Sequence, residues 1–205
     1  MMNIDMNNLN STLIDVLKEL GNIGSGNATT SLAKLINKKV DMEVPQVKIL
    51  DFKDVSEALG NAEKTVIGIY FEMEGDIVGN IMFILDQSSA RNLVDILMNR
   101  EGDEKDLSDM DISALSEIGN ILAASYINSL STLTGLNIKI SIPSVAIDMA
   151  GAIISVPAVQ FGIMGDKVLF IETEFQEDNK QVHGDLFLIP EIESFEKILN
   201  SLGVI

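Results

Sequence analysis

The chain has 205 residues, of which 46% are hydrophobic and 22% are charged, and this composition indicates a folded globular protein. Its formal net charge of −17, with a single histidine, predicts repulsion from nucleic acid and anionic membranes, so we exclude both as partners. The absence of cysteine excludes disulfide and thiol chemistry and fits a cytoplasmic protein.

Two further segments bear on location. Residues 1–13 have no basic start and no apolar run, so we expect no signal peptide. The most apolar stretch, residues 145–164, is interrupted by Asp148 and Pro157. A membrane-spanning helix needs about 18 or more predominantly apolar residues. We therefore expect a soluble protein.

The first predicted element is a long helix that starts near Asn10. Apolar residues recur at helical spacing through residues 13–20, and the pattern resumes at residues 29–37. Between these stretches, "ELGNIGSGNATTSL" at residues 19–32 resembles a phosphate-binding loop. It lacks the lysine of such a loop and follows no strand. The glycines are better explained as positions where a neighbouring element packs closely against the helix.

Strands follow this helix. Alternating β-branched residues predict a strand at residues 40–50 and a hairpin of residues 65–74 and 76–86, which turns at Glu74, Gly75 and Asp76. Residues 89–100 have the pattern of a short amphipathic helix. The polar, acidic segment 98–109 then reads as a linker between two halves of the chain, about 8–100 and about 106–205.

The second half repeats the first. Residues 117–145 align with residues 19–47 without gaps at an offset of 98, and Glu19, Gly21 and Asn22 find the same residue types at Glu117, Gly119 and Asn120. The second copy replaces Gly24 and Gly26 by larger residues, which also argues against a phosphate loop. A duplicated subdomain of this length is too large for a solenoid repeat.

The elements of the second half follow the same order. A capping box at Ser108 and Asp111 predicts that its helix starts near Ser108. Strands are predicted at 137–147, 167–176 and 183–190, and a last helix at 194–203. The whole pattern predicts one α+β domain with internal pseudo-two-fold symmetry, in which long helices pack on an antiparallel sheet.

A polar stripe recurs on both long helices. Its members stand at positions i, i+4 and i+7, which share one helix face: Asp15, Glu19 and Asn22, then Ser113, Glu117 and Asn120. On a single helix such a stripe is typical of an ordinary solvated face, and Thr12 with Asp15 has the spacing of a capping box. Recurrence of Glu and Asn in both copies, while many neighbours differ, favours a functional role.

The chemistry of these residue types narrows that role. An Asn amide both donates to and accepts from a water, and a Glu binds a Lys or Arg or acts as a base. The sequence has no metal-binding cluster and no Ser-His-Asp set, and His183 is predicted to be a turn residue at a strand start. So sparse a site suffices where the substrate brings most of the catalyst, as in phosphoryl transfer with an oriented water.

The sequence resembles the CheC family of chemotaxis phosphatases, with its relatives CheX and FliY. The family pattern is Asp or Ser, three residues, Glu, two residues, Asn, twenty-two residues, Pro. Both copies fit it without gaps, as "ELGN" at 19–22 with Pro45 and "EIGN" at 117–120 with Pro143. The resemblance, with the duplication, covers nearly the whole chain.

The resemblance implies hydrolysis of the aspartyl phosphate on the response regulator CheY. Asn22 and Asn120 would hold the attacking water, and Glu19 and Glu117 would pair with the regulator's active-site Lys. Asp15 and Ser113 would assist at the edge, and the two prolines would shape the start of each strand. The chain would carry no cofactor or metal of its own, because Mg²⁺ would belong to the regulator.

Further expectations follow from the resemblance. The segment "VAIDM" at 145–149 resembles the docking site for the receptor deamidase CheD, with Asp148 as the contact. Gly21 and Gly119 would keep bulk away from the partner's surface. Two motifs in one chain imply a monomer whose halves replace the dimer of CheX. The alternative function is a non-catalytic chemotaxis or flagellar-switch adaptor that binds CheY or CheD.

Overall fold

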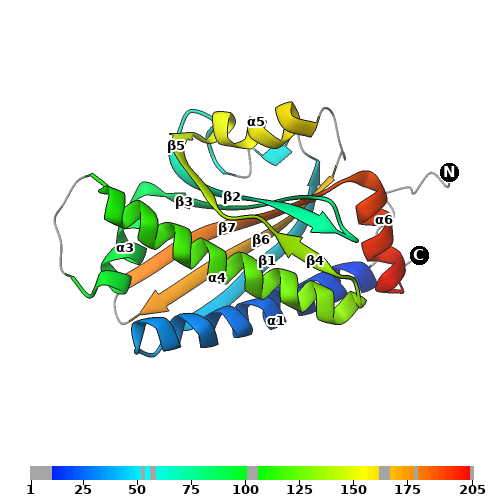
Figure 1. The fold of residues 1–205 in the computed structure, drawn as a ribbon, viewed down its shortest axis with the longest axis horizontal. Helices are drawn as coiled ribbons and strands as arrows, with labels where there is room; N and C mark the ends of the chain where they lie inside the picture. Colours follow the sequence, from blue (N-terminus) through cyan, green and yellow to red (C-terminus); the bar gives the residue numbers. More distant parts are fainter. Residues whose placement is uncertain are drawn as a thin grey trace.

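The computed structural model describes residues 11–51, 54–55, 59–100, 106–161, 167–177 and 180–203. Within these residues, one antiparallel sheet of seven strands carries two long helices on one face and a short helix on the other (Figure 1). This arrangement confirms the predicted α+β class with long helices on an antiparallel sheet.

The two halves share an order of long helix, strand, hairpin and short helix, and the second half divides its first strand into two and adds the helix α5 among the described residues. The first half forms α1 (Ser11–Ile36), β1 (Asp41–Asp51), β2 (Thr65–Gly75), β3 (Gly79–Asp86) and α3 (Gln87–Met98). The second half forms α4 (Asp109–Thr134), β4 (Ile138–Ile140), β5 (Ser144–Met149), α5 (Ala150–Phe161), β6 (Lys167–Glu177), β7 (Lys180–Pro190) and α6 (Ile192–Ser201). The offset of 98 between the sequence repeats carries the bounds of α1 onto those of α4.

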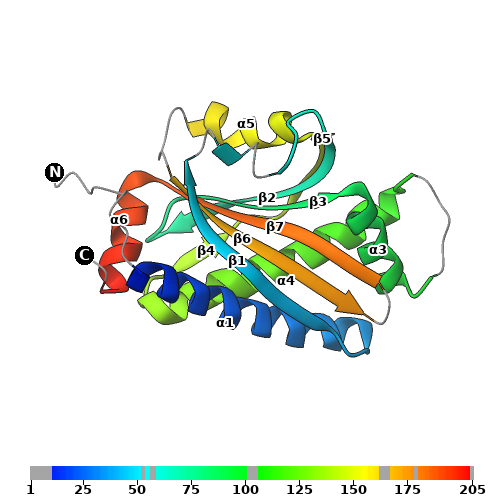
Figure 2. The ribbon, with the colours of Figure 1, turned by 180° about the vertical axis from the view of Figure 1, so that it is seen from behind.

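Strands of the two halves pair with each other in the sheet. Its order is β1-β6-β7-β3-β2-β4, and β5 also pairs with β2. The first strand of each half therefore lies beside a strand of the other half, as Figure 2 shows for β1 and β6. The central β3–β7 pair joins the halves a third time. The order is symmetric about this pair, which confirms the predicted pseudo-two-fold arrangement.

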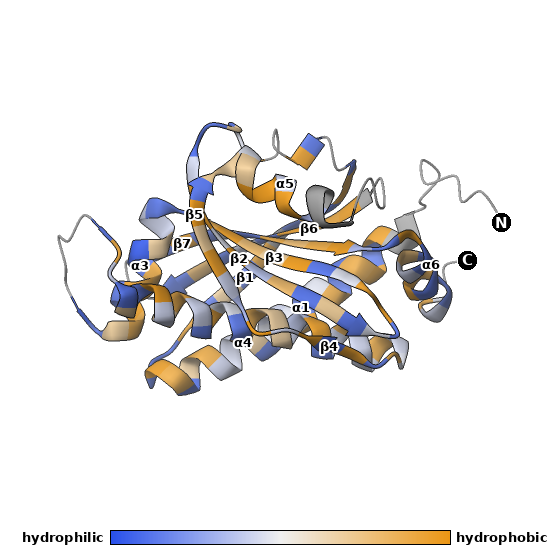
Figure 3. Ribbon diagram, turned by 45° about the horizontal axis from the view of Figure 1, so that its top comes forward, coloured by the Kyte–Doolittle hydropathy of each residue, from blue (hydrophilic) through white to orange (hydrophobic). Residues whose placement is uncertain are grey.

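The two faces of the sheet have separate cores. Alternate side chains of the strands pack with the buried faces of α1, α3, α4 and α6 in the larger cluster. On the opposite face, α5 buries Ile153 and Ile154 against residues such as Val66 and Phe187. Figure 3 shows α5 as a largely hydrophobic helix. No helix in the described parts of the chain is long and apolar enough to cross a membrane.

Several predictions about local structure need correction. Residues 137–147 were expected to form one strand, but the structure divides them between β4 and β5, with Pro143 in the gap. His183 was expected at a turn, but it lies within β7, paired with Glu174 of β6. The helix α5, which contains Pro157, was not predicted, because its sequence is apolar nearly throughout and has no helical periodicity.

The two motif prolines lie at equivalent irregularities of the sheet: Pro143 directly precedes β5, as expected, whereas Pro45 lies within β1 and not at its start. In β1, the register against β6 shifts between Glu43 and Gln46, the segment that contains Pro45. In the second copy, Ile140 pairs with Met73 and Ser144 with Tyr70, so three residues oppose two. Proline has no N–H to donate to a strand ladder, which explains a break at this point in both copies.

Candidate functional site

The six stripe residues lie toward solvent on the two long helices. The side chains of Asp15, Glu19, Asn22, Ser113 and Glu117 are exposed, and that of Asn120 is half-buried. On each helix, the core is formed by the opposite face, which includes Leu17 and Leu20 in α1 and Leu115 and Ile118 in α4. Each predicted stripe is therefore a single outward surface of a helix whose other side is fixed against the sheet.

Gly21 and Gly119 are buried and face the sheet, not a partner. A Cβ atom on Gly21 would lie 3.1 Å from Val44 Cγ1 of β1, and one on Gly119 would lie 2.7 Å from Ile69 Cγ2 of β2. The expectation that these glycines keep bulk away from a partner's surface is therefore wrong. They bring the helix close to the sheet at the level of the adjacent Asn.

The remaining glycines of "GNIGSG" are helical too. Gly24 lies against the ring of Tyr126, where α1 crosses α4, and leaves no room for a Cβ atom. Gly26 is exposed, with nothing within 4 Å of a Cβ atom. The segment is thus part of α1 and no phosphate loop, and close packing at Gly24 confirms the alternative interpretation.

The structure keeps the two stripes apart. The start of α1 lies near α6 and the start of α4 near α3, so the two helices run in opposite directions (Figure 1). Each stripe occupies the first half of its own helix, at residues 15–22 of 11–36 and 113–120 of 109–134. The two stripes therefore lie toward opposite ends of the helix pair, as two separate sites.

The polar groups of each stripe are available to a partner. Within the described residues, the side chains of Glu19, Asn22, Glu117 and Asn120 form no hydrogen bond or ion pair. An exposed carboxylate can accept from a cation, and an exposed carboxamide can donate and accept at once. The described parts of the chain contain no group of three or more His, Cys, Asp or Glu side chains that could hold a metal ion.

The start of α4 is held by a network of charged hydrogen bonds. Ser108 and Asp111 form the predicted capping box, in which the Asp111 carboxylate accepts from the N–H of Ser108 at 2.8 Å. Arg100, just after α3, donates to the same carboxylate. Burial alone would raise the pKa of Asp111, but the hydrogen bonds from Ser108 and Arg100 outweigh it and hold the pKa below its usual value.

Asp148 lies on β5 at the other side of the sheet. Its side chain is exposed, and its Oδ1 accepts from the N–H of Met149 at 2.7 Å. The neighbouring Ile147 and Met149 are 47% and 48% exposed, and Val156 of α5 is 42% exposed. Sequence patterns do not identify these apolar side chains as exposed. Ile147 and Met149 are exposed because β5 lies at the edge of the sheet, and Val156 is exposed on a helix that was not predicted.

Comparisons with known proteins match the segments that carry the stripes. The CheC-like family model matches residues 14–49 and 110–147. The chain is 36% identical over 202 residues to the CheY-P phosphatase CheC of Bacillus subtilis (strain 168), a match that covers 96% of this chain and 97% of the relative.

Two solved structures share the fold. The FliY structure from Thermotoga maritima matches with a TM-score of 0.76 and 24% identity, over 95% of this chain and 98% of that chain. A chain of the CheX–CheY–BeF3–Mg2+ complex from Borrelia burgdorferi matches with a TM-score of 0.51 and 17% identity, over 84% of this chain and 97% of that chain.

Proposed function

This chain belongs to the CheC-like family, and from that premise we propose that it hydrolyses the aspartyl phosphate of the response regulator CheY. The observation that carries the proposal is the pair of outward stripes. Each displays a Glu and an Asn one turn apart on the solvent face of a helix that is packed firmly against the sheet. The relative from Bacillus subtilis is named for this activity.

In the proposed reaction, the asparagine positions a water. Phosphoryl transfer requires little covalent chemistry from a catalyst, so alignment of the nucleophile is a principal contribution. The amide of Asn22 or Asn120 holds a water in line with the phosphorus. The water oxygen bonds to phosphorus as the bond to the aspartyl oxygen breaks, and the products are inorganic phosphate and the free aspartate of CheY.

The other stripe residues hold the partner. Glu19 and Glu117 pair with the active-site Lys of CheY, which fixes the helix over the phosphoryl group. Asp15 and Ser113 contact the partner one turn away. Mg²⁺ is a component of the regulator's site, so the chain brings no cofactor. The proposal includes a monomer with two sites and a cytoplasmic location, which the cysteine-free sequence fits.

The first test compares two substrates. The protein should accelerate phosphate release from CheY charged with acetyl phosphate, and it should leave a small chromogenic phosphate ester almost untouched, because the ester brings neither Lys nor Mg²⁺. Rapid turnover of the ester would show that the chain carries a complete catalytic set of its own. Binding of phosphorylated CheY without faster phosphate release would support the adaptor function instead.

We also propose that CheD docks on β5 around Asp148. The exposed Ile147 and Met149 beside it would supply apolar contact area at this edge of the sheet. Asp148→Lys should weaken CheD binding at least tenfold in a titration, a typical loss at an interface hot spot. Glu43→Lys is the matched control, because Glu43 is an exposed acid on the opposite edge strand. Equal affinity of both variants would place CheD elsewhere.

A further inference from the structure

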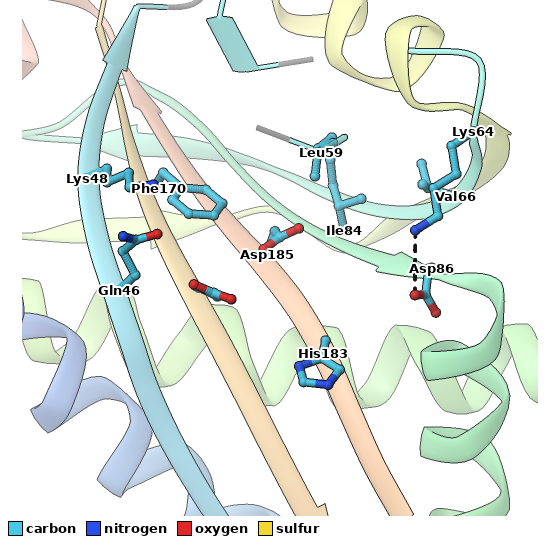
Figure 4. A pocket seen from close by; sticks show the side chains of 11 residues that line it. Gln46, Lys48, Leu59, Lys64, Val66, Ile84, Asp86, Phe170, His183 and Asp185 are labelled. Carbon is cyan, nitrogen blue, oxygen red and sulfur yellow. Dashed lines mark ion pairs between the residues drawn. The ribbon is translucent and has the colours of Figure 1, made fainter. Parts of the chain in front are cut away.

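The face of the sheet opposite α1 and α4 contains a polar cavity of about 320 Å³. Strands β1, β6, β7, β3 and β2 contribute to its lining, and Leu59 and Lys64 close one side (Figure 4). One wall is apolar, with Phe170 and Ile84, and the rest carries charged side chains. The helix α5 covers the apolar end of this sheet face, so the polar end remains outside the core that it forms.

Two carboxylates face each other across the strands at this cavity. Glu172 of β6 and Asp185 of β7 are direct partners in the register, and like charges in that position destabilise a sheet. Neither side chain has a hydrogen bond or an ion pair within the described residues. Burial, together with the neighbouring Glu172, raises the pKa of Asp185 to about 6. Lys64 and His183 act on the pKa of Asp185 in the opposite direction, but burial and Glu172 outweigh them, so the described residues compensate the pair only in part.

The nearby cations offset the charge of this pair only in part. Lys64 forms an ion pair with Asp86 at 3.6 Å, so its positive charge is already shared. Lys48 pairs in register with Phe170 and is exposed at the rim (Figure 4). His183 stands one row further along β7, opposite Glu174. None of these three side chains forms an ion pair with both carboxylates in the described part of the chain, so the pair can accept a further cation.

We propose that this cavity binds a small organic cation, an alkylammonium or guanidinium compound of about amino-acid size, with its charged group between Glu172 and Asp185. Sites for small molecules are typically about 300–1,000 Å³, and this cavity lies at the lower end of that range. Two carboxylates match the several N–H donors of such a group. The ring of Phe170 and the side chain of Ile84 provide apolar contact for the rest of the molecule.

The test is calorimetric titration of the full chain with L-arginine and with L-citrulline, its uncharged analogue of nearly the same shape. We expect arginine to bind. Citrulline should bind at least about tenfold more weakly, because it cannot form charge-assisted hydrogen bonds with the two carboxylates. Agmatine, which has the guanidinium group of arginine but no carboxylate, is the second probe. Its binding does not depend on contacts between the carboxylate of arginine and Lys48.

Three variants locate the site. Glu172→Gln and Asp185→Asn should each weaken arginine binding about tenfold. Both should fold normally, because each removes a like-charge repulsion, and a thermal melt checks this. Glu174→Gln is the control: it lies on the same strand and pairs with Gln181 and His183, and it does not line the cavity. Its affinity should be unchanged.

Three outcomes would overturn the inference. Equal binding of arginine and citrulline would remove the role of the positive charge. An equal loss in Glu174→Gln would mean general attraction to a chain of net charge −17, with no specific site. No binding of either arginine or agmatine would show that the cavity does not take this class of ligand.

Discussion

The two motif helices present the same residue types outward but are supported differently. Both are 26 residues long and both place a Glu and an Asn on the solvent face. Inward, Gly21 of α1 meets an edge strand, β1, whereas Gly119 of α4 meets β2, which has neighbours on both sides. A capping box and Arg100 hold the start of α4. Asn22 is exposed, and Asn120 is half-buried.

The difference shows which features the site needs and which it tolerates. The copies have diverged where the helices touch each other: Gly24 of α1 has a leucine, Leu122, as its counterpart, and Tyr126 has an alanine, Ala28. They agree at the outward Glu and Asn. The outward stripe is thus independent of the details of inward packing, as long as each helix remains fixed to the sheet.

The largest expected effect comes from removing both asparagines. Asn22→Ala with Asn120→Ala should lower turnover of phosphorylated CheY about a hundredfold, the typical loss when an aligned reactant is no longer held. Each single variant should keep the turnover contributed by the other site. A difference in turnover between the two single variants would measure how far the two sites differ. The measurement is phosphate release at saturating CheY.

Asn128→Ala is the control for this pair, because Asn128 is an exposed Asn on α4 outside the stripe. It should retain full turnover. A double variant that melts normally and keeps wild-type turnover would rule out the water-positioning role.

The next effect concerns the hydrogen bonds that hold the start of α4. Asp111→Asn removes the buried charge that accepts from Ser108 and Arg100, and should lower the free energy of unfolding by about 2 kcal/mol. Because the pKa of Asp111 is lowered in the folded protein, its stabilisation is present above pH 4 or so and is lost as the pH falls through the folded pKa.

Urea unfolding at neutral and acid pH tests this prediction, and the difference between wild type and variant should shrink at acid pH. Asp109→Asn is the control, because Asp109 is exposed in the same first turn. It should cost about 0.5 kcal/mol. Equal losses in the two variants would mean that the effect is general to the helix start and that the buried pair contributes little.

The smallest effects come from the glycines. Gly119→Ala should destabilise by about 1–2 kcal/mol, because its Cβ would lie 2.7 Å from Ile69 Cγ2 and 2.9 Å from Ile69 Cδ1. Gly21→Ala meets Val44 at 3.1 Å beside an edge strand that yields more easily, so its loss should be smaller. Gly26→Ala has free space and should stabilise by about 0.5–1 kcal/mol. Thermal melts of the three variants check this order.

Much of the fold could be predicted because its signals are local. The capping box at Ser108, the periodic leucines of the long helices and the turn after β2 each act over a few residues. The internal repeat added a second kind of signal. Because Glu and Asn recur in both copies while many neighbouring residues differ, the repeat identified them as the candidate functional residues. Both stripes could be placed on outward faces for the same reason.

The missed features depend on contacts between distant segments. The helix α5 shows no periodicity because it packs on the sheet with one side and exposes apolar Val156 on the other. The role of Gly119 is set by Ile69, fifty residues earlier in the chain. The opposition of Glu172 and Asp185 follows from the register of β6 on β7, which sequence spacing alone does not reveal.

The first strand of each half pairs with a strand of the other half, so neither half can complete its sheet alone. Four ladders cross between the halves: β1–β6, β5–β2, β4–β2 and β3–β7. Two pieces produced by a backbone cut between α3 and α4 could separate only if all four ladders broke together, so they should stay associated and reassemble as complementing fragments. For the same reason, a circular permutant opened at that point should keep every strand pairing, because the permutation changes the order of the halves along the chain and leaves their intertwining intact.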